Sequence, residues 1–219
     1  KIATSRANGS YSFAVSYGWS GTVTPSKPGF AFSPLKKTYA NVIADKPAQN
    51  YSAYAPAGTV TVMKPTYKWT KIAGATQYQY QVMQGTKIVY SKTVASSVCG
   101  VITCSSIPTK SLVMGTFKWK VRAMVNGAWK AYSPVTTFVI KPKAGYWKLP
   151  DKIEFYITYI TPTQASVNLF EAVFKVCGGE YSTIPTGPLT IGNGHFTLAG
   201  SFYVDGTIDS PTTASGIYQ

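Results

Sequence analysis

Acidic residues are scarce in this chain of 219 residues, which has 7 Asp and Glu against 21 Lys and Arg and a formal net charge of +14. Asp45 is the only acid among residues 1–150. Glycoside hydrolysis needs two carboxyl groups beside the scissile bond, and no such pair can be identified. His195 is the single histidine, and no nucleophile or carboxylate stands at a recognisable spacing from it. We therefore predict no catalytic residue, no metal site, no cofactor and no enzymatic activity.

Long apolar runs and charged residues are also few. No stretch of about 18 apolar residues occurs, so we expect no membrane span. Charged residues make up 13% of the chain, about half of the usual share, which excludes a disordered or coiled-coil chain. The sequence begins with Lys1 and shows no signal-peptide pattern, so we expect a mature, processed or excised piece.

Aromatic residues, glycine and proline are abundant, with 16 Tyr, 19 Gly and 14 Pro. This composition favours strands and turns over helices. Apolar and polar side chains alternate with a period of two in YSFAVSY, YQYQVMQ and FKWKVRAM, as in strands with one face buried. Residues 165–176 have some helical character but are also expected to form a strand. We predict an all-β chain of tandem β-sandwiches.

Two Pro/Gly-rich joints, YAPAG and KPKAG, divide the chain into three sections of different charge. Residues 1–57 have a net charge of +5, residues 58–142 have eleven basic and no acidic residues, and residues 143–219 have a net charge of −2. Short segments of this composition are typical of linkers. The prediction is one domain for each section.

Residues 1–57 contain the run GWSGTVTPSK at positions 18–27, followed by Tyr39, Asp45 and QNY at positions 49–51. These residues resemble the end of an Ig-like or transthyretin-like repeat of bacterial cell-surface and secreted proteins. The resemblance implies a β-sandwich whose front strands do not precede Thr4 in this chain. We expect this first sandwich to be incomplete, with a hydrophobic groove and open strand edges.

Residues 58–142 contain PTYKW, GATQY and WKVRA, which resemble a fibronectin type III-like module of bacterial surface proteins. In residues 143–219, GNGHF and FYVDGTIDSPTTASGIY resemble a third bacterial surface β-domain. Together the three resemblances imply an extracellular protein of the bacterial cell surface.

Three cysteines are present, and two of them, Cys99 and Cys104, stand five apart in VCGVITC. A disulfide that closes a small loop is the favoured interpretation. Half of a metal site is the alternative, but only His195 and Cys177 remain as further ligands. Cys177 is predicted to be either a buried thiol or a link to another chain.

Three tryptophans, Trp19, Trp129 and Trp147, are candidates for a glycan-binding platform on which rings stack against sugars. Core packing is the alternative for most aromatic residues of a β-sandwich. In YQYQVMQ we expect Tyr78 and Tyr80 to face the core and the glutamines to face outward.

The basic middle section has no recognisable nucleic-acid module, and only two of the 21 cationic residues are Arg, so we predict no nucleic-acid partner. A Lys-rich, acid-free sandwich suits anionic cell-wall polymers or an acidic neighbouring subunit, and glycans are also candidate partners. The sequence predicts an extracellular structural protein, a subunit of a bacterial surface filament, sheath or fibre. We expect a homo-oligomer or polymer built by β-strand addition between subunits. The alternative is an adhesin or a glycan-binding module from a larger secreted protein.

Overall fold

The computed structural model describes residues 1–148, 153–161, 164–176, 179–183, 189–191, 195–198, 204–210 and 213–218. From residue 146 onward it describes the backbone and, of the side chains, only the exposed Thr197. Nearly all regular structure in these residues is β-strand, and the exception is one 3-10 turn, η1, at Ser96–Val98. The predicted all-β class is confirmed, including a strand at Gln164–Val176 where the sequence had some helical character.

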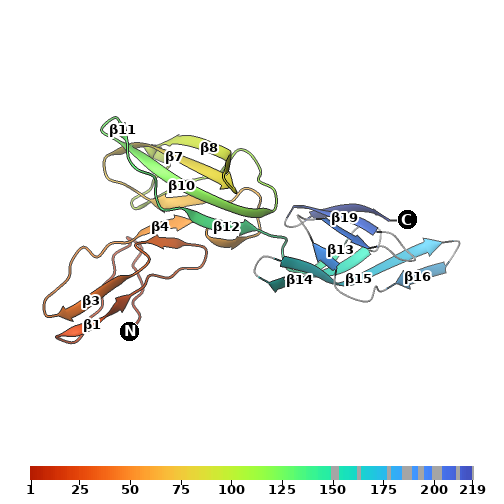
Figure 1. The fold of residues 1–219 in the computed structure, drawn as a ribbon, viewed down its shortest axis with the longest axis horizontal. Helices are drawn as coiled ribbons and strands as arrows, with labels where there is room; N and C mark the ends of the chain where they lie inside the picture. Colours follow the sequence, from red (N-terminus) through yellow and green to blue (C-terminus); the bar gives the residue numbers. More distant parts are fainter. Residues whose placement is uncertain are drawn as a thin grey trace. The chain divides into compact units, whose positions relative to one another are not determined.

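The chain forms two compact units (Figure 1). The first contains residues 1–58, 64–110 and 117–138, and the second contains residues 59–63, 111–116 and 139–219. The predicted division into three domains stays a prediction.

Two sheets form a β-sandwich in the middle of the chain. The smaller sheet has the order β2-β4-β6-β9, and the larger has the order β5-β12-β10-β7-β8 with β11 paired to β10. The strands of the smaller sheet are Ala31–Ser33 (β2), Ser52–Ala55 (β4), Tyr67–Thr70 (β6) and Thr103–Ser106 (β9). Those of the larger are Gly58–Val60 (β5), Ala75–Gln84 (β7), Lys87–Ala95 (β8), Gly115–Val125 (β10), Ala128–Trp129 (β11) and Thr136–Ile140 (β12).

Aromatic side chains fill the space between these two sheets. The Tyr67 ring from β6 stacks on Tyr80 from β7 at a centroid distance of 4.8 Å, and it meets Trp119 from β10 edge-on at 5.0 Å. Trp69 and Tyr78 lie 5.4 Å apart in the same layer. Because alternate residues of each strand enter this layer, the period-two patterns seen in the sequence are those of a half-buried sheet. Tyr78 and Tyr80 are buried, as predicted.

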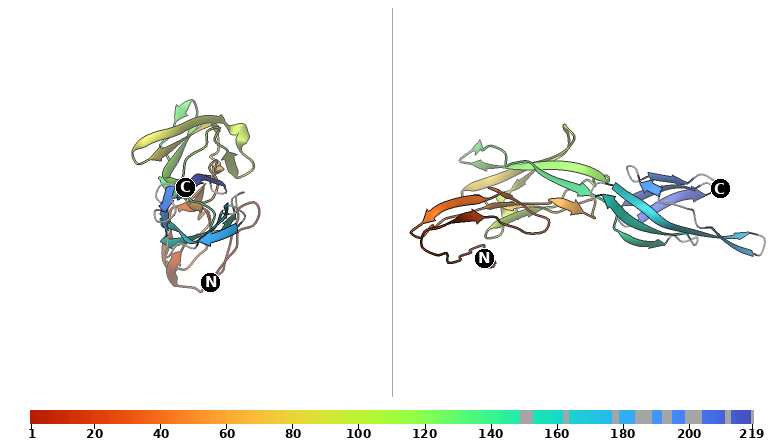
Figure 2. Two further views of the ribbon diagram at one scale, coloured as in Figure 1. Left: turned by 90° about the vertical axis from the view of Figure 1, so that its right-hand side faces the viewer. Right: turned by 60° about the horizontal axis from the view of Figure 1, so that its bottom comes forward.

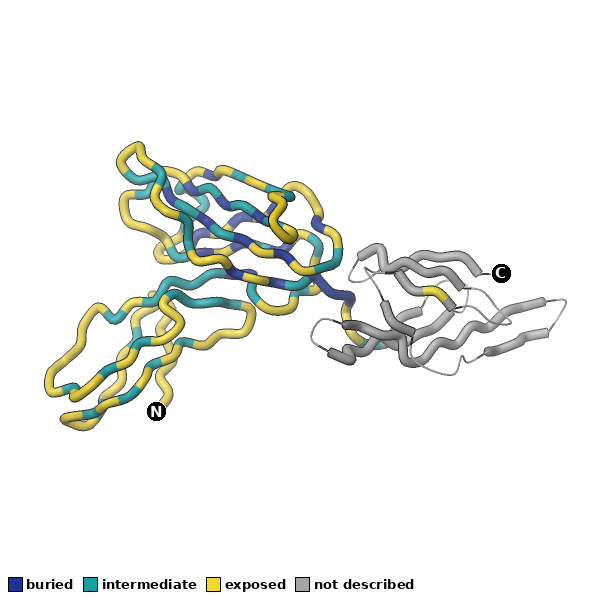
Figure 3. The backbone as a smooth tube through the Cα atoms, in the orientation of Figure 1, coloured by how far each residue is buried: buried dark blue, intermediate teal, exposed yellow. Residues whose placement is uncertain are grey.

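Strands β1 (Trp19–Val23) and β3 (Lys37–Val42) form a two-stranded sheet of their own within the first unit (Figures 1 and 2). Figure 3 shows that the buried positions of this unit lie in the sandwich and not along β1 and β3. No residue from 1 to 54 is buried, and the first buried residue is Ala55.

The second unit also consists of antiparallel sheets. One has the order β13-β14-β15-β16 with β17 paired to β15, and the other has the order β18-β19-β20. Their strands are Gly145–Lys148 (β13), Ile153–Thr161 (β14), Gln164–Val176 (β15), Gly179–Thr183 (β16), Leu189–Ile191 (β17), His195–Leu198 (β18), Val204–Ser210 (β19) and Thr213–Tyr218 (β20). Across the described residues of the chain, no helix has the length and apolar character needed to cross a membrane.

Candidate functional site

The β1–β3 sheet has one half-buried face and one exposed face. Half-buried and exposed residues alternate along β1, with Trp19, Gly21 and Val23 on the half-buried side. Tyr39 lies opposite Gly21 in the register of the two strands. The sheet has no third strand among the described residues, so each strand keeps one unpaired edge.

A close approach of side chain and backbone shapes the half-buried face. The Trp19 ring covers Gly21, because a Cβ atom at Gly21 would lie 2.3 Å from Trp19 Cζ2. The same ring packs against Tyr39 at a centroid distance of 6.1 Å. Glycine is therefore required at position 21 for the ring to lie flat on the strand.

Tyrosine hydroxyls tie the N-terminal segment together, and two of them donate to Gln49. The Tyr11 hydroxyl donates to the Gln49 backbone carbonyl, and the Tyr39 hydroxyl donates to Gln49 Oε1 at 2.9 Å. The Tyr51 hydroxyl donates to the Val23 carbonyl at 3.1 Å. Burial raises the pKa of Tyr11, and the Tyr39 hydroxyl raises it further. These hydrogen bonds connect parts of a segment in which no residue from 1 to 54 is buried.

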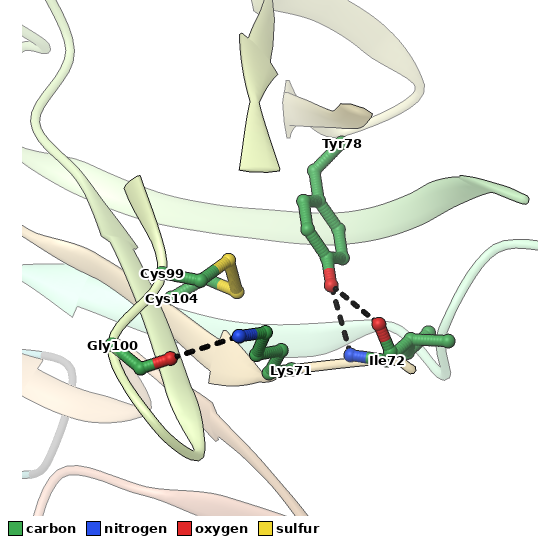
Figure 4. The surroundings of a disulfide bond; sticks show 6 residues. All are labelled: Lys71, Ile72, Tyr78, Cys99, Gly100 and Cys104. Atoms are coloured by element: carbon green, nitrogen blue, oxygen red, sulfur yellow. Dashed lines mark hydrogen bonds between the residues drawn. A yellow bond between two sulfur atoms is a disulfide. The ribbon is translucent and has the colours of Figure 1, made fainter. Parts of the chain in front are cut away.

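Cys99 and Cys104 form a disulfide (Figure 4), as predicted. Cys104 is buried in β9 opposite Trp69, so the bond fastens a short loop to the smaller sheet. The Lys71 ammonium donates to the Gly100 carbonyl of this loop at 3.3 Å (Figure 4). Val101 in this loop is exposed.

Trp129 lies in a cluster on the outer face of the larger sheet, which we call the Arg122 cluster (Gln79, Lys120, Arg122, Trp129 and Tyr132). The guanidinium carbon of Arg122 is 4.7 Å from the ring centroid of Trp129 and 4.7 Å from that of Tyr132. Lys120 Nζ lies 4.2 Å from the Tyr132 centroid. The rings thus face cations of the same sheet, an arrangement that stabilises both partners.

A cleft of about 120 Å³ opens beside this cluster. Arg122 and Tyr132 form part of its lining, and Ser52, Thr70 and Ser133 contribute hydroxyl groups. Its residues come from both sheets of the sandwich, so the fold itself brings them together.

The predicted tryptophan platform consists of residues that the fold places on different strands. Trp19 lies in β1, Trp129 in β11 and Trp147 in β13. Among the described ring contacts, none joins Trp19 to Trp129. Trp147 lies opposite Phe155 in the backbone register of β13 and β14. Cys177 lies outside the described residues. Arg122 is not among the residues predicted to form a site, although the alternation in FKWKVRAM places it on the same face as Lys118 and Lys120.

Potential metal ligands do not gather in the part of the chain that the structure describes, where no group of three His, Cys, Asp or Glu residues could hold an ion. His195 begins β18, opposite Thr207 in β19.

Comparison with known proteins gives no further assignment, because the chain matches no protein-family model, no curated protein and no solved structure.

Proposed function

We propose that this chain is an extracellular structural protein, a subunit of a bacterial surface filament, sheath or fibre that assembles by β-strand addition. One observation carries the proposal: β1 and β3 form an isolated two-stranded sheet in a segment where no residue from 1 to 54 is buried.

A two-stranded sheet is marginally stable in water, since it buries little apolar surface. Its outer edges also carry unpaired N–H and C=O groups that can accept another strand. A strand from a second subunit supplies backbone hydrogen bonds along an edge and places alternate side chains on the face of Trp19, Val23 and Tyr39. The addition gives the β1–β3 sheet a third strand, which it does not have among the described residues.

Strand addition of this kind is directional, because one surface of a subunit contacts a different surface of the next. Such head-to-tail contacts make an open polymer when the rotation does not close. The net charges of +11 over residues 58–142 and −2 over residues 143–219 favour one orientation. This electrostatic contribution weakens at high salt. The disulfide is suited to an oxidising extracellular compartment.

Electron microscopy of protein isolated from its source, with light scattering after size exclusion in low and high salt, tests the proposal. We expect regular filaments whose subunits contain this chain. Monomers that never assemble at either salt concentration contradict it.

A pair of variants tests whether the β1–β3 sheet is the assembly surface. Val23→Lys places a charge on the half-buried face, and Thr22→Lys places the same charge on the exposed face of the same strand. We expect Val23→Lys to abolish assembly and Thr22→Lys to leave it nearly unchanged. Equal effects of the two variants would show that the half-buried face is not used.

A further inference from the structure

The Arg122 guanidinium is held in a fixed position on the outer face of β10. Trp129 and Tyr132 flank it, each at 4.7 Å from its central carbon. Its Nε donates to Gln79 Oε1 at 2.9 Å, and the Tyr132 hydroxyl donates to the same oxygen at 2.9 Å. A guanidinium has five N–H donors, so its two terminal nitrogens carry four more. The residue is therefore ordered before any ligand arrives, which lowers the entropy cost of binding.

Further cations continue along the same strand face. Lys118, Lys120 and Arg122 occupy alternate positions of β10, about 7 Å apart from one to the next. Lys118 is exposed, and the other two are half-buried. No acidic residue occurs between positions 58 and 142. Positive charge thus accumulates on this face without a carboxylate from the same section of the chain.

Neutral polar groups border the cations. Gln79 and Gln81 of β7 lie opposite Arg122 and Lys120 in the strand register. The adjacent cleft adds the hydroxyl groups of Ser52 and Thr70. The Ser133 hydroxyl also lines the cleft, but it already accepts from the Val121 N–H and donates to the Pro134 carbonyl. Amides and hydroxyls can donate and accept hydrogen bonds, which suits a ligand that is itself rich in hydroxyl groups.

We propose that the Arg122 cluster, with Lys118 and the adjacent cleft, binds a carboxylated polysaccharide. Arg122 takes a carboxylate through its terminal nitrogens, because the planar guanidinium matches the planar carboxylate with two parallel hydrogen bonds. Lys118 and Lys120 attract neighbouring carboxylates of the polymer. Trp129 is a positioning residue that keeps the guanidinium in place.

A nucleic acid fits this surface less well. Binding of single strands depends on aromatic rings that stack on bases. Here the rings of Trp129 and Tyr132 face Arg122, and Tyr132 also faces Lys120. The proposed site does not depend on assembly into filaments, so it can be tested separately from the proposed function.

Binding of polygalacturonate to the full chain tests the proposal, with dextran as the neutral polymer and single-stranded DNA as the other polyanion. We expect saturable binding of polygalacturonate that weakens with salt, little binding of dextran and weaker binding of DNA. Equal or tighter binding of DNA overturns the assignment to a carboxylated polysaccharide, as does equal binding of dextran.

Substitutions then locate the site. Arg122→Gln should weaken binding of polygalacturonate about tenfold or more, since it removes a charge-assisted pair of hydrogen bonds. The matched control is Lys68→Gln, which removes one charge from an exposed position of β6 in the other sheet. It should change affinity less than about twofold, as expected for an exposed charge. Equal losses from the two variants overturn the site, because they indicate a response to net charge alone.

Two conservative variants separate geometry from charge. Arg122→Lys keeps the charge and loses the two parallel hydrogen bonds, so affinity should fall while the salt dependence stays. Trp129→Phe should retain binding, whereas Trp129→Ala should lower affinity without changing that salt dependence. Unchanged affinity in both Arg122→Lys and Trp129→Ala would contradict the role of a positioned guanidinium.

Discussion

The two parts of the first unit use aromatic residues in opposite ways. In the sandwich, Trp69, Trp119 and Tyr67 are almost fully buried and contact rings from the facing sheet. In the β1–β3 sheet, Trp19 and Tyr39 pack on each other but remain half-exposed. Aromatic residues thus form a buried core where two sheets face each other. Where a single sheet is present, they form a half-exposed surface.

The largest effect is expected from removing a tryptophan of the sandwich core. Trp119→Ala should lower the free energy of unfolding by about 3–5 kcal/mol, because it leaves a cavity. It also removes the hydrogen bond from Trp119 Nε1 to the Pro56 carbonyl. Trp19→Ala should cost less than about 1 kcal/mol, since that ring is half-exposed. Urea unfolding followed by circular dichroism measures both, and similar losses would mean that the β1–β3 sheet has a core of its own.

Alkaline pH should destabilise the sandwich through its buried tyrosines. Burial raises the pKa of Tyr67 and Tyr80 far above the ordinary value of 10. The folded state therefore retains the phenol proton where the unfolded state loses it. This contribution to stability is fully present below about pH 10 and decreases above it, by about 1.4 kcal/mol per pH unit for each tyrosine.

Tyr67→Phe is the variant that checks this pH dependence. It should reduce the alkaline slope of the unfolding free energy, which urea titrations between pH 8 and pH 11 measure. The Tyr67 hydroxyl is buried without a hydrogen-bond partner, so its removal should not destabilise the protein at neutral pH. A loss of stability at pH 7, or an unchanged slope, would contradict the role given to this side chain.

The disulfide should contribute about 2 kcal/mol, as expected for closing a loop with a sequence separation of 5. Replacing both cysteines by alanine should lower the unfolding free energy by this amount and leave the β1–β3 sheet unaffected. Reduction of the unmodified protein with dithiothreitol serves as the control and should produce the same loss. A change in the Trp19 environment would indicate that the loop also supports the N-terminal segment.

The smallest effect on stability is expected from Gly21→Ala. The added methyl group would overlap the Trp19 ring, so the indole must move. Because the β1–β3 sheet has no buried residue, the unfolding free energy should change by less than about 0.5 kcal/mol. The indole N–H signal of Trp19 in nuclear magnetic resonance spectra should shift while that of Trp119 stays. Gly100→Ala is the control, since a Cβ there meets its nearest neighbour at 3.7 Å.

Local sequence patterns were sufficient to predict the strands, and the reason is physical. YQYQVMQ and FKWKVRAM alternate apart from Met83 and Met124. Every second residue is buried from Tyr78 to Val82 in β7 and from Phe117 to Ala123 in β10, as that pattern requires. The close spacing of Cys99 and Cys104 was likewise enough to predict their disulfide. Contacts between residues that are close in the sequence depend on local backbone geometry, so the spacing of residue types is enough to predict them.

Contacts between distant segments could not be predicted in this way. β4 pairs with β6, and β2 pairs with β4, although a predicted domain boundary lies between β4 and β6. The Arg122 cluster brings together residues from β7, β10, β11 and the segment that follows. Trp129 was identified as a candidate for binding sugars, but its cation partner depends on strand pairing. The order of strands in a sheet follows from packing of the whole chain.

The pairing of β4 with β6 also bears on how such a protein can be divided or recombined. Residues 31–55 supply two of the four strands of the smaller sheet. A gene fragment that starts at residue 58 therefore encodes a sandwich with half of one layer removed, whose remaining edge strand, β6, is rich in buried aromatic residues. A folded piece that keeps all four strands of this layer therefore starts upstream of β2.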